Sequence, residues 1–266
     1  MMERLNVDEI MALQWMGYED EQIRKTSLEE FDRLYDEEPR LEELLEKANT
    51  LLDRQEADGV VSLAWHDARF PKRLLKIGRD CPAVIHLKGD LSLLGEEKAV
   101  AIIGARAADK EGNDASYKLG RKYAEEGNVI VSGLALGCDA AAHRGCLAVG
   151  GKTIAIVGSG LDICHPKENK PLEQEILEKG GLMLSEQPYG VKANPTRLVA
   201  RNRLQAALST AVILAQCPEK SGSLHTMRFA RKYRKRSLAV DFPKPTTANA
   251  GNRQLIADGL AQPITI

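Results

Sequence analysis

Features of membrane and secreted proteins are missing from this sequence of 266 residues. No apolar run approaches the roughly 18 residues of a membrane-spanning helix, and the start, Met1-Met2-Glu3-Arg4, lacks the charged-then-apolar pattern of a signal segment. The five cysteines are odd in number and scattered, which is typical of reduced thiols rather than of a disulfide framework. We therefore expect a cytoplasmic protein that does not contact a membrane.

The common motifs of nucleotide and metal enzymes are also missing. Gly158-Ser159-Gly160 supplies only a G-x-G, and neither a G-x-G-x-x-G fingerprint nor a G-x-x-x-x-G-K-[ST] loop occurs. Cys138, His143 and Cys146 share a predicted helix, but the first two lie about 140° apart around it and do not converge as zinc ligands would. No G-x-S-x-G elbow marks a nucleophilic serine. We expect no catalytic residue, no metal and no cofactor.

Charge is divided unevenly along the chain, although the net charge is only −1. Residues 1–59 carry 18 acidic and 7 basic side chains, whereas residues 60–266 carry 20 acidic and 30 basic ones. A basic body favours an anionic partner. The alternative is that the acidic segment neutralises the basic body by lying against it.

The hydrophobic pattern predicts two units. Residues 1–59 are expected to be helical, with a capping box at Ser27 and Glu30 and an apolar stripe from Leu41 to Leu52. Residues 60–266 begin with two short β-rich runs and then alternate between buried strands and helices, which indicates an α/β fold of the extended Rossmann type with a doubly wound, mostly parallel sheet. The expected strands of this sheet are 100–103, 129–131, 153–157, 182–184, 211–215, 237–240 and 264–266.

Small polar residues follow five of these strands, where ligands bind in open parallel sheets. They are Gly104-Ala105-Arg106, Ser132 to Gly137, Gly158-Ser159-Gly160, Ser185-Glu186 and Ser221-Gly222-Ser223. Glycine lets backbone N–H groups approach an anion, and a following helix adds partial positive charge, so this edge of the sheet is predicted to bind phosphate. The alternative is that the glycines only form tight turns. Cations on the same edge support phosphate binding, although each alone could be a solvated charge: Arg106, Lys167, Lys170, Arg201 and Arg203.

An ordered series of motifs resembles the DNA-processing protein A (DprA/Smf) family. Val100 to Arg106, Val131 to His143 and Thr153 to Asp162 match the family core, and the shorter motifs follow in the same order: His165-Pro166, Asn169-Lys170, Leu184 to Glu186, Arg201 to Arg203 and Ser221 to Leu224. The resemblance covers roughly residues 60–266.

The resemblance implies a non-catalytic Rossmann-type protein that binds single-stranded DNA and forms a homodimer. In natural transformation such proteins protect incoming DNA and help to load the RecA recombinase. By motif position, the resemblance implies that Arg106 and Lys170 would be the leading phosphate contacts, with Arg201 and Arg203 nearby. The residues expected to line the same pocket are Gly104, Gly158, Ser159, Gly160, Ser221, Gly222 and Ser223.

Two positions depart from the family pattern. Ala105 stands where a serine is usual, which removes a hydroxyl, and Cys164-His165 stands where a tyrosine usually precedes the proline, which removes a stacking group. Only 5% of the residues are aromatic, so we expect few stacking contacts with bases. The cluster from Arg231 to Arg236 is predicted to be a solvated helix end, with additional DNA contact as the less favoured alternative.

A second function remains open. Nucleotide-binding proteins and nucleotide phosphoribohydrolases of the related lysine-decarboxylase-like group share this type of fold. Those enzymes carry a P-G-G-x-G-T-x-x-E loop, whereas the corresponding stretch here, Lys220 to Phe229, contains no glutamate. The sequence therefore favours DNA binding over hydrolysis.

Overall fold

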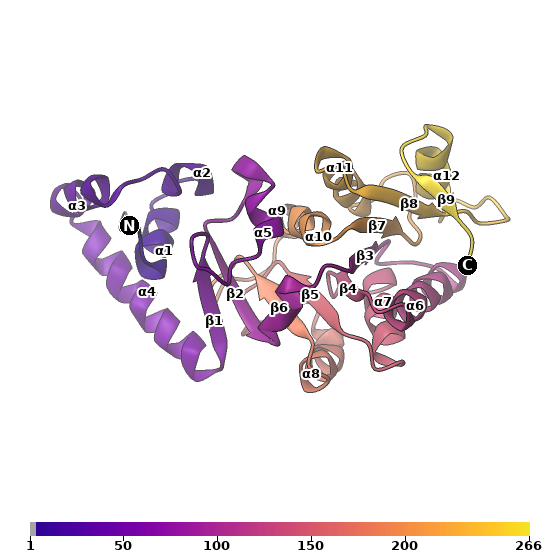
Figure 1. The fold of residues 1–266 in the computed structure, drawn as a ribbon, viewed down its shortest axis with the longest axis horizontal. Helices are drawn as coiled ribbons and strands as arrows, with labels where there is room; N and C mark the ends of the chain where they lie inside the picture. Colours follow the sequence, from indigo (N-terminus) through magenta and orange to yellow (C-terminus); the bar gives the residue numbers. More distant parts are fainter. Residues whose placement is uncertain (1–3) are drawn as a thin grey trace.

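The computed structural model describes residues 4–266 and shows an elongated molecule built around one sheet (Figure 1). Its nine strands lie in the order β1-β2-β6-β5-β4-β3-β7-β8-β9. Strands β3 to β9 pair in parallel, whereas β1 and β2 form an antiparallel extension beside β6. The predicted α/β fold with a doubly wound, mostly parallel sheet is confirmed. The strands are β1 Val60–Ala64, β2 Val84–Gly89, β3 Ala99–Ile103, β4 Val129–Ser132, β5 Thr153–Val157, β6 Leu182–Ser185, β7 Ala211–Leu214, β8 Arg236–Val240 and β9 Gln262–Ile264.

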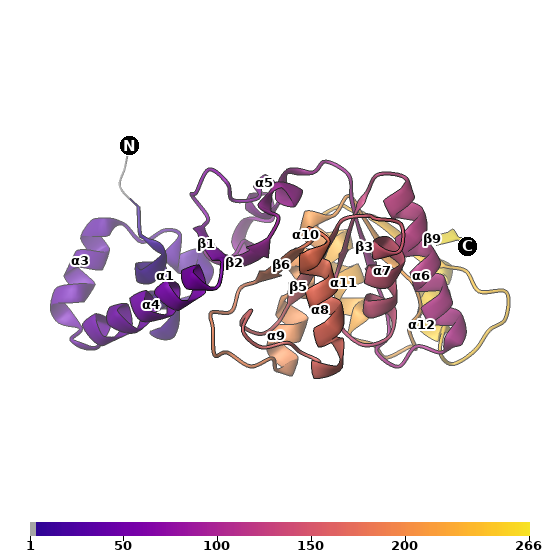
Figure 2. The same ribbon diagram turned by 90° about the horizontal axis from the view of Figure 1, so that it is seen from below.

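Helices cover both faces of the parallel sheet. Successive residues of a strand point to opposite sides, so each strand packs with helices on both faces. Val100 and Ile102 of β3 pack with α6 and α7, whereas Ala101 and Ile103 pack with α10 and α11. Figure 2 shows α6, α7 and α8 side by side over one face. No helix within residues 4–266 is long and apolar enough to span a membrane. The helices of this region are α6 Lys110–Glu125, α7 Cys138–Leu147, α8 Lys170–Glu178, α9 Pro195–Ala200, α10 Asn202–Leu208, α11 Ser223–Lys232 and α12 Ala250–Ala257.

The amino-terminal helices lie at the β1 end of the sheet (Figure 1). They are α1 Val7–Trp15, α2 Asp20–Ile23, α3 Leu28–Glu37 and α4 Arg40–Ala57. The predicted capping box is present, since the Glu30 N–H donates to Ser27 Oγ at 3.2 Å and the Ser27 N–H donates to the Glu30 carboxylate at 2.8 Å. Apolar residues of α1 and α4 join the same hydrophobic cluster as β1 and β2. The division into units 1–59 and 60–266 stays a prediction.

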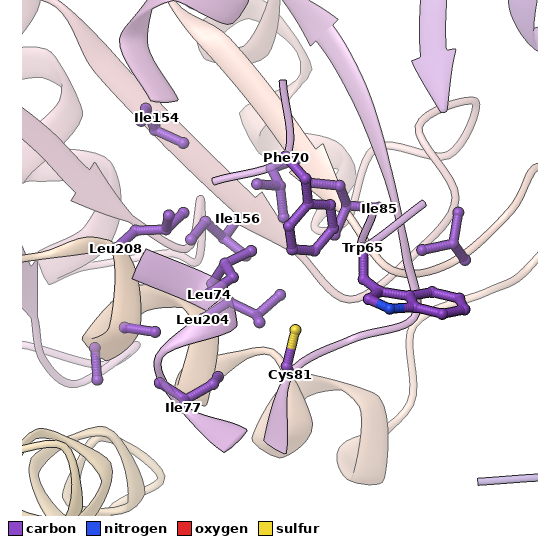
Figure 3. Close-up of a cluster of buried hydrophobic side chains, with 14 of the residues drawn as sticks. Trp65, Phe70, Leu74, Ile77, Cys81, Ile85, Ile154, Ile156, Leu204 and Leu208 are labelled. Atoms are coloured by element: carbon purple, nitrogen blue, oxygen red, sulfur yellow. The ribbon is translucent and has the colours of Figure 1, made fainter. Parts of the chain in front are cut away.

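The connection between β1 and β2 packs against α10. This helix carries the predicted site residue Arg203, and Arg201 stands directly before its first residue. Figure 3 shows its apolar side chains gathered against the sheet and α10. Phe70, Leu74 of α5 (Lys72–Leu75) and Ile77 lie in one buried cluster with Leu204 and Leu208 of α10. The short 3-10 helix η1 Gly78–Asp80 ends this connection, and η2 Leu91–Gly95 follows β2. The packing of Phe70, Leu74 and Ile77 holds α10 against the sheet, with Asn202 at its start near the carboxyl ends of the central strands.

The strand order reverses at β3. From β3 the chain builds β4, β5 and β6 on one side and then β7, β8 and β9 on the other. The loops that leave β3 and β7 therefore run in opposite directions and open a crevice at the carboxyl ends of these two strands. In open parallel sheets such a switch point is where ligands bind.

Candidate functional site

A pocket of about 480 Å³ occupies this crevice. We call it the switch-point pocket. Its walls are the loop after β3, the start of α7, helices α9 and α10, and the loop after β7 with the start of α11. It is lined by Ile103, Gly104, Ala105, Arg106, Ala107, Ala135, Asp139, Pro195, Leu198, Val199, Arg201, Asn202, Gln205, Pro218, Lys220, Ser221, Gly222, Ser223 and Thr226.

The structure brings six of the predicted site residues to this pocket and leaves five outside its lining. The six are Gly104, Arg106, Arg201, Ser221, Gly222 and Ser223. Gly158, Ser159, Gly160, Lys170 and Arg203 do not line it. No residue of the acidic segment 4–59 lines it either.

The loops after β3 and β7 are tied to each other. The Ser223 hydroxyl donates to the Gly104 carbonyl at 2.6 Å, and the Ala105 N–H donates to the Gln216 carbonyl at 2.7 Å. Ser221 Oγ accepts from the Ser223 N–H at 3.3 Å and so closes the turn that begins α11. These bonds set the width of the pocket between the two loops.

Backbone donors of both loops are left without protein partners. Within residues 4–266, no acceptor takes a hydrogen bond from the N–H of Arg106, Ala107, Ser221 or Gly222. Groups of this kind beside a helix start can hold an anion. The side chains of Arg106 and Lys220 are exposed here and form no ion pair with any residue described by the structure. Two cations and four residues with free backbone N–H groups therefore line one hollow.

Gly104 and Gly222 are glycines for different reasons. A Cβ at Gly104 would lie 2.4 Å from Cys138 Sγ and 2.8 Å from the Gln216 carbonyl oxygen, so close packing requires a glycine there. A Cβ at Gly222 would meet no atom within 4 Å. Neither crowding nor a left-handed backbone explains Gly222, where φ is −60°. The space beside the Gly222 backbone is therefore open.

Arg201 lies beneath the pocket in a buried ion pair with Asp139. Its guanidinium donates to the Ile156 carbonyl at 2.7 Å and lies 3.7 Å from the Asp139 carboxylate, and the two residues are 6% and 5% exposed. Burial raises the pKa of Asp139, and the Arg201 charge opposes this rise. Burial also lowers the pKa of Arg201. The pair shapes the pocket floor and neutralises the acidic group that lines it.

The loop after β5 lies next to the pocket but is packed against other chain segments. Leu198 and Arg197 of α9 cover Gly158, the Gly160 N–H donates to the Val191 carbonyl at 2.8 Å, and Ser159 is fully buried with its hydroxyl donating to Ile163 at 2.7 Å. These three residues support the wall that α9 forms.

Lys170 begins α8, beyond that loop. Its amine lies 2.6 Å from the Glu173 carboxylate, and its side chain is 51% exposed. This hydrogen bond raises the pKa of Lys170. Lys170 is thus a surface cation with one partner, outside the pocket lining.

Arg203 points away from the pocket. Its guanidinium forms a bidentate pair with Glu186, lies 3.8 Å from Asp20 of α2, and donates to the Asp80 carbonyl at 2.8 Å. The charges of Glu186 and Asp20 raise its pKa against the opposing effect of burial. Arg203 joins α10 to the amino-terminal helices and is saturated by these partners.

Several pocket residues were not predicted from the sequence. Lys220 stands directly before the Ser221-Gly222-Ser223 motif and carries the same charge as Arg106. Helix α9 also lines the pocket and was missed, although Asn194-Pro195 is a helix-start signal: the Asn194 side chain accepts from the Arg197 N–H at 2.8 Å. Within residues 4–266, no group of three or more His, Cys, Asp or Glu side chains could hold a metal ion.

The fold and the site define a Rossmann-type α/β protein with a ligand pocket at its switch point. The chain belongs to the DNA recombination-mediator protein A family, whose model matches residues 62–266. The predicted family is thereby confirmed.

Relatives carry names from the same family. DNA processing protein DprA of Streptococcus pneumoniae is 39% identical over 180 residues, which are 68% of this chain and 63% of that protein. Protein Smf of Synechocystis is 39% identical over 170 residues, which are 63% of this chain and 42% of that protein. The chain thus spans less than two thirds of the length of either relative.

Two solved structures share the fold. The X-ray structure of DNA processing protein A from S. pneumoniae superimposes with a TM-score of 0.79, covers 98% of this chain and 95% of that one, and is 32% identical. The second structure, of DNA processing protein A from Helicobacter pylori, concerns its single-stranded DNA binding mode. It superimposes with a TM-score of 0.69, covers 77% of this chain and 90% of that one, and is 35% identical.

Proposed function

We propose that this protein binds single-stranded DNA, without catalysing a reaction, by holding backbone phosphates in the switch-point pocket. The observation that carries the proposal is that residues with free backbone N–H groups line one hollow together with the cations Arg106 and Lys220. Asp139, the one acidic side chain that lines the pocket among the residues described by the structure, is paired with Arg201. Family membership and the single-stranded DNA binding of the H. pylori relative support the choice of ligand.

The chemistry of the pocket favours recognition of the backbone over recognition of bases. None of its lining residues, all within the described part of the chain, is aromatic, so bases have no stacking platform there. Phosphate neutralisation then dominates the affinity. Binding should be tolerant of sequence and should weaken steeply as salt is added.

The test is a titration of single-stranded oligonucleotides at several salt concentrations, with the variant Arg106→Ala. Losing one phosphate contact should flatten the salt slope by about 0.7 and lower the affinity about tenfold or more for every sequence alike. The matched control is Lys118→Ala, which removes an exposed cation of α6 that does not line the pocket. An unchanged slope for Arg106→Ala, or equal losses in both variants, would contradict the proposal.

Incubation with nucleoside monophosphates separates this function from hydrolysis. We expect no release of free base, because the lining contains no glutamate and its aspartate is buried in an ion pair. Release of free base that Arg106→Ala abolishes would replace DNA binding by a phosphoribohydrolase activity.

The wider role that we propose is that of a recombination mediator in natural transformation, acting as a homodimer and helping to load RecA on the bound strand. The family description supports the mediator role. Sedimentation of the protein tests the dimer. A RecA filament-assembly assay on protein-coated single strands tests the loading step, and no acceleration of assembly would contradict it.

A further inference from the structure

Helix α11 connects the switch-point pocket, at the carboxyl ends of the strands, with a basic turn at their amino ends. Its first residue, Ser223, lines the pocket, and its ten residues span about 15 Å. The helix contains no acidic residue, and Arg228, Arg231 and Lys232 are exposed along it. The turn that follows, from Lys232 to Arg236, leads into β8 and carries a cation at every position except Tyr233.

Two hollows flank this basic turn. One, of about 350 Å³, is lined by Arg73, Lys76, Ile77 and residues 232–235, and the other, of about 420 Å³, by Arg231, residues 234–237 and residues 259–262. Among residues 4–266, no acidic side chain lines either hollow. Each hollow is therefore bordered by charge of one sign.

Some of these cations have structural duties and others do not. Arg73 and Lys235 donate to the Leu208 and Ala207 carbonyls at 2.6 and 2.9 Å, and so complete the end of α10. Lys232 pairs with Asp80. The others form no ion pair with any residue in the described part of the chain: Lys76, Arg231, Arg234 and Arg236.

Lys235 lies in basic surroundings. Burial, together with the charges of Arg73 and Lys76, lowers its pKa to about 8. Apart from Asp80, which pairs with Lys232, no acidic side chain in the described part of the chain forms an ion pair with these cations. A bound anion would supply compensating negative charge.

Arg234 occupies a backbone position that suits glycine. Its φ is +56°, and it follows the last turn of α11 in the left-handed conformation that closes many helices. The Lys235 N–H completes the closure by donating to the Ala230 carbonyl at 2.8 Å. An L side chain is disfavoured there, and that of Arg234 is exposed, so packing offsets little of the cost. The guanidinium thus serves no evident purpose in the fold.

We propose that the basic turn, with Lys76 opposite it, contacts phosphates of the same DNA strand after that strand leaves the switch-point pocket along the exposed face of α11. This inference rests on the proposed function. The pocket holds one segment of the backbone, and Arg228 and Arg231 guide it toward Lys76 and Arg234. The turn extends the binding site without adding base recognition.

The experiment measures affinity against oligonucleotide length and salt for the wild type, Arg234→Gly and Lys76→Ala. Each variant should bind long single strands of about 20 nucleotides about fourfold more weakly at 0.15 M salt, with a salt slope flatter by about 0.7. Affinity should level off at a shorter oligonucleotide than for the wild type. Arg234→Gly relieves the left-handed backbone, so its Tm should stay unchanged or rise by about 2 °C.

The outcomes separate the two proposals. This inference would be overturned if both variants kept the salt slope of the wild type, or if Arg234→Gly bound more weakly and also had a lowered Tm. A loss of DNA affinity in Arg106→Ala alone would leave only the pocket as a site. If Arg234→Gly and Lys76→Ala weaken binding while Arg106→Ala does not, the pocket proposal fails. The basic turn with Lys76 is then the binding site. Lys118→Ala again serves as the control for nonspecific loss of charge.

Discussion

Replacing Arg201 by alanine tests whether this residue supports the pocket or contacts the DNA. The sequence places it among candidate phosphate contacts, whereas the structure buries its guanidinium against Asp139 and the Ile156 carbonyl. Removal leaves the Asp139 carboxylate, which is 5% exposed, without its nearest opposite charge. The Ile156 carbonyl also loses its donor at 2.7 Å.

The expected loss of stability is large. Breaking one side of a buried ion pair costs about 3–5 kcal/mol, because the remaining charge stays desolvated. For a chain of this size each kcal/mol lowers the Tm by about 2–4 °C, so Arg201→Ala should lower it by about 10 °C. The carboxylate would respond by protonating, since burial already raises its pKa.

Urea unfolding of a double-mutant cycle provides the measurement. Arg201→Ala and Asp139→Asn should each destabilise the protein, and the double variant should lose less than the sum, because no unpaired charge remains. DNA affinity of Asp139→Asn, measured well below its Tm, should stay near that of the wild type. An unfolding free energy of Arg201→Ala within about 1 kcal/mol of the wild type, together with lost DNA binding, would refute the structural role.

Three other perturbations have defined outcomes. Gly222→Ala should leave the free energy of unfolding unchanged or raise it by about 0.4–1 kcal/mol, since its Cβ meets no atom within 4 Å. The same variant should weaken DNA binding. Wild-type affinity in a titration would show that the DNA backbone does not approach Gly222. Gly104→Ala should instead cost about 1–3 kcal/mol in urea unfolding, because its Cβ would overlap Cys138 Sγ at 2.4 Å; a neutral result would contradict the packing. Burial lowers the pKa values of His86 and His143 to about 4 and about 3. Below pH 6.5 the unfolded state therefore binds protons that the folded state does not, and His86 alone should remove about 3 kcal/mol of stability between pH 6.5 and pH 4. His86→Gln should flatten that decline, and a wild-type profile in this variant would contradict it.

The parallel strands were predictable because burial on both faces leaves long apolar runs in the sequence. Strand β5 begins and ends at the predicted residues, and β3 differs by one residue at its start. The β7–α11 loop was identified because Ser221-Gly222-Ser223 follows a strand and precedes a helix. Such signals are local, and a single chain segment carries them.

The residues that share the pocket were harder to predict, because strand order and helix faces are set by tertiary packing. Nothing local to β3 or β7 states that they are neighbours, yet the pocket exists only because they are. Arg201 and Arg203 looked equivalent in the sequence. Residues i and i+2 of a helix point about 200° apart around its axis. Arg201 therefore reaches the pocket and Asp139, whereas Arg203 reaches Glu186.

The glycines show how the structure changes the reason for proposing an anion site. Their presence in four of the five loops after the strands suggested phosphate approach. Gly104, however, is explained by Cys138, and Gly160 by the Pro188 carbonyl oxygen, 2.4 Å from a Cβ placed there. Two of the described glycines line the pocket, Gly104 and Gly222, and of these only Gly222 has open space at the position of an added Cβ. The proposed phosphate binding therefore depends on Arg106, Lys220 and the free N–H groups of the loops after β3 and β7. Because those groups come from two loops that diverge at the switch point, the affinity for DNA should depend on the hydrogen bond from Ser223 to Gly104 that holds the loops together.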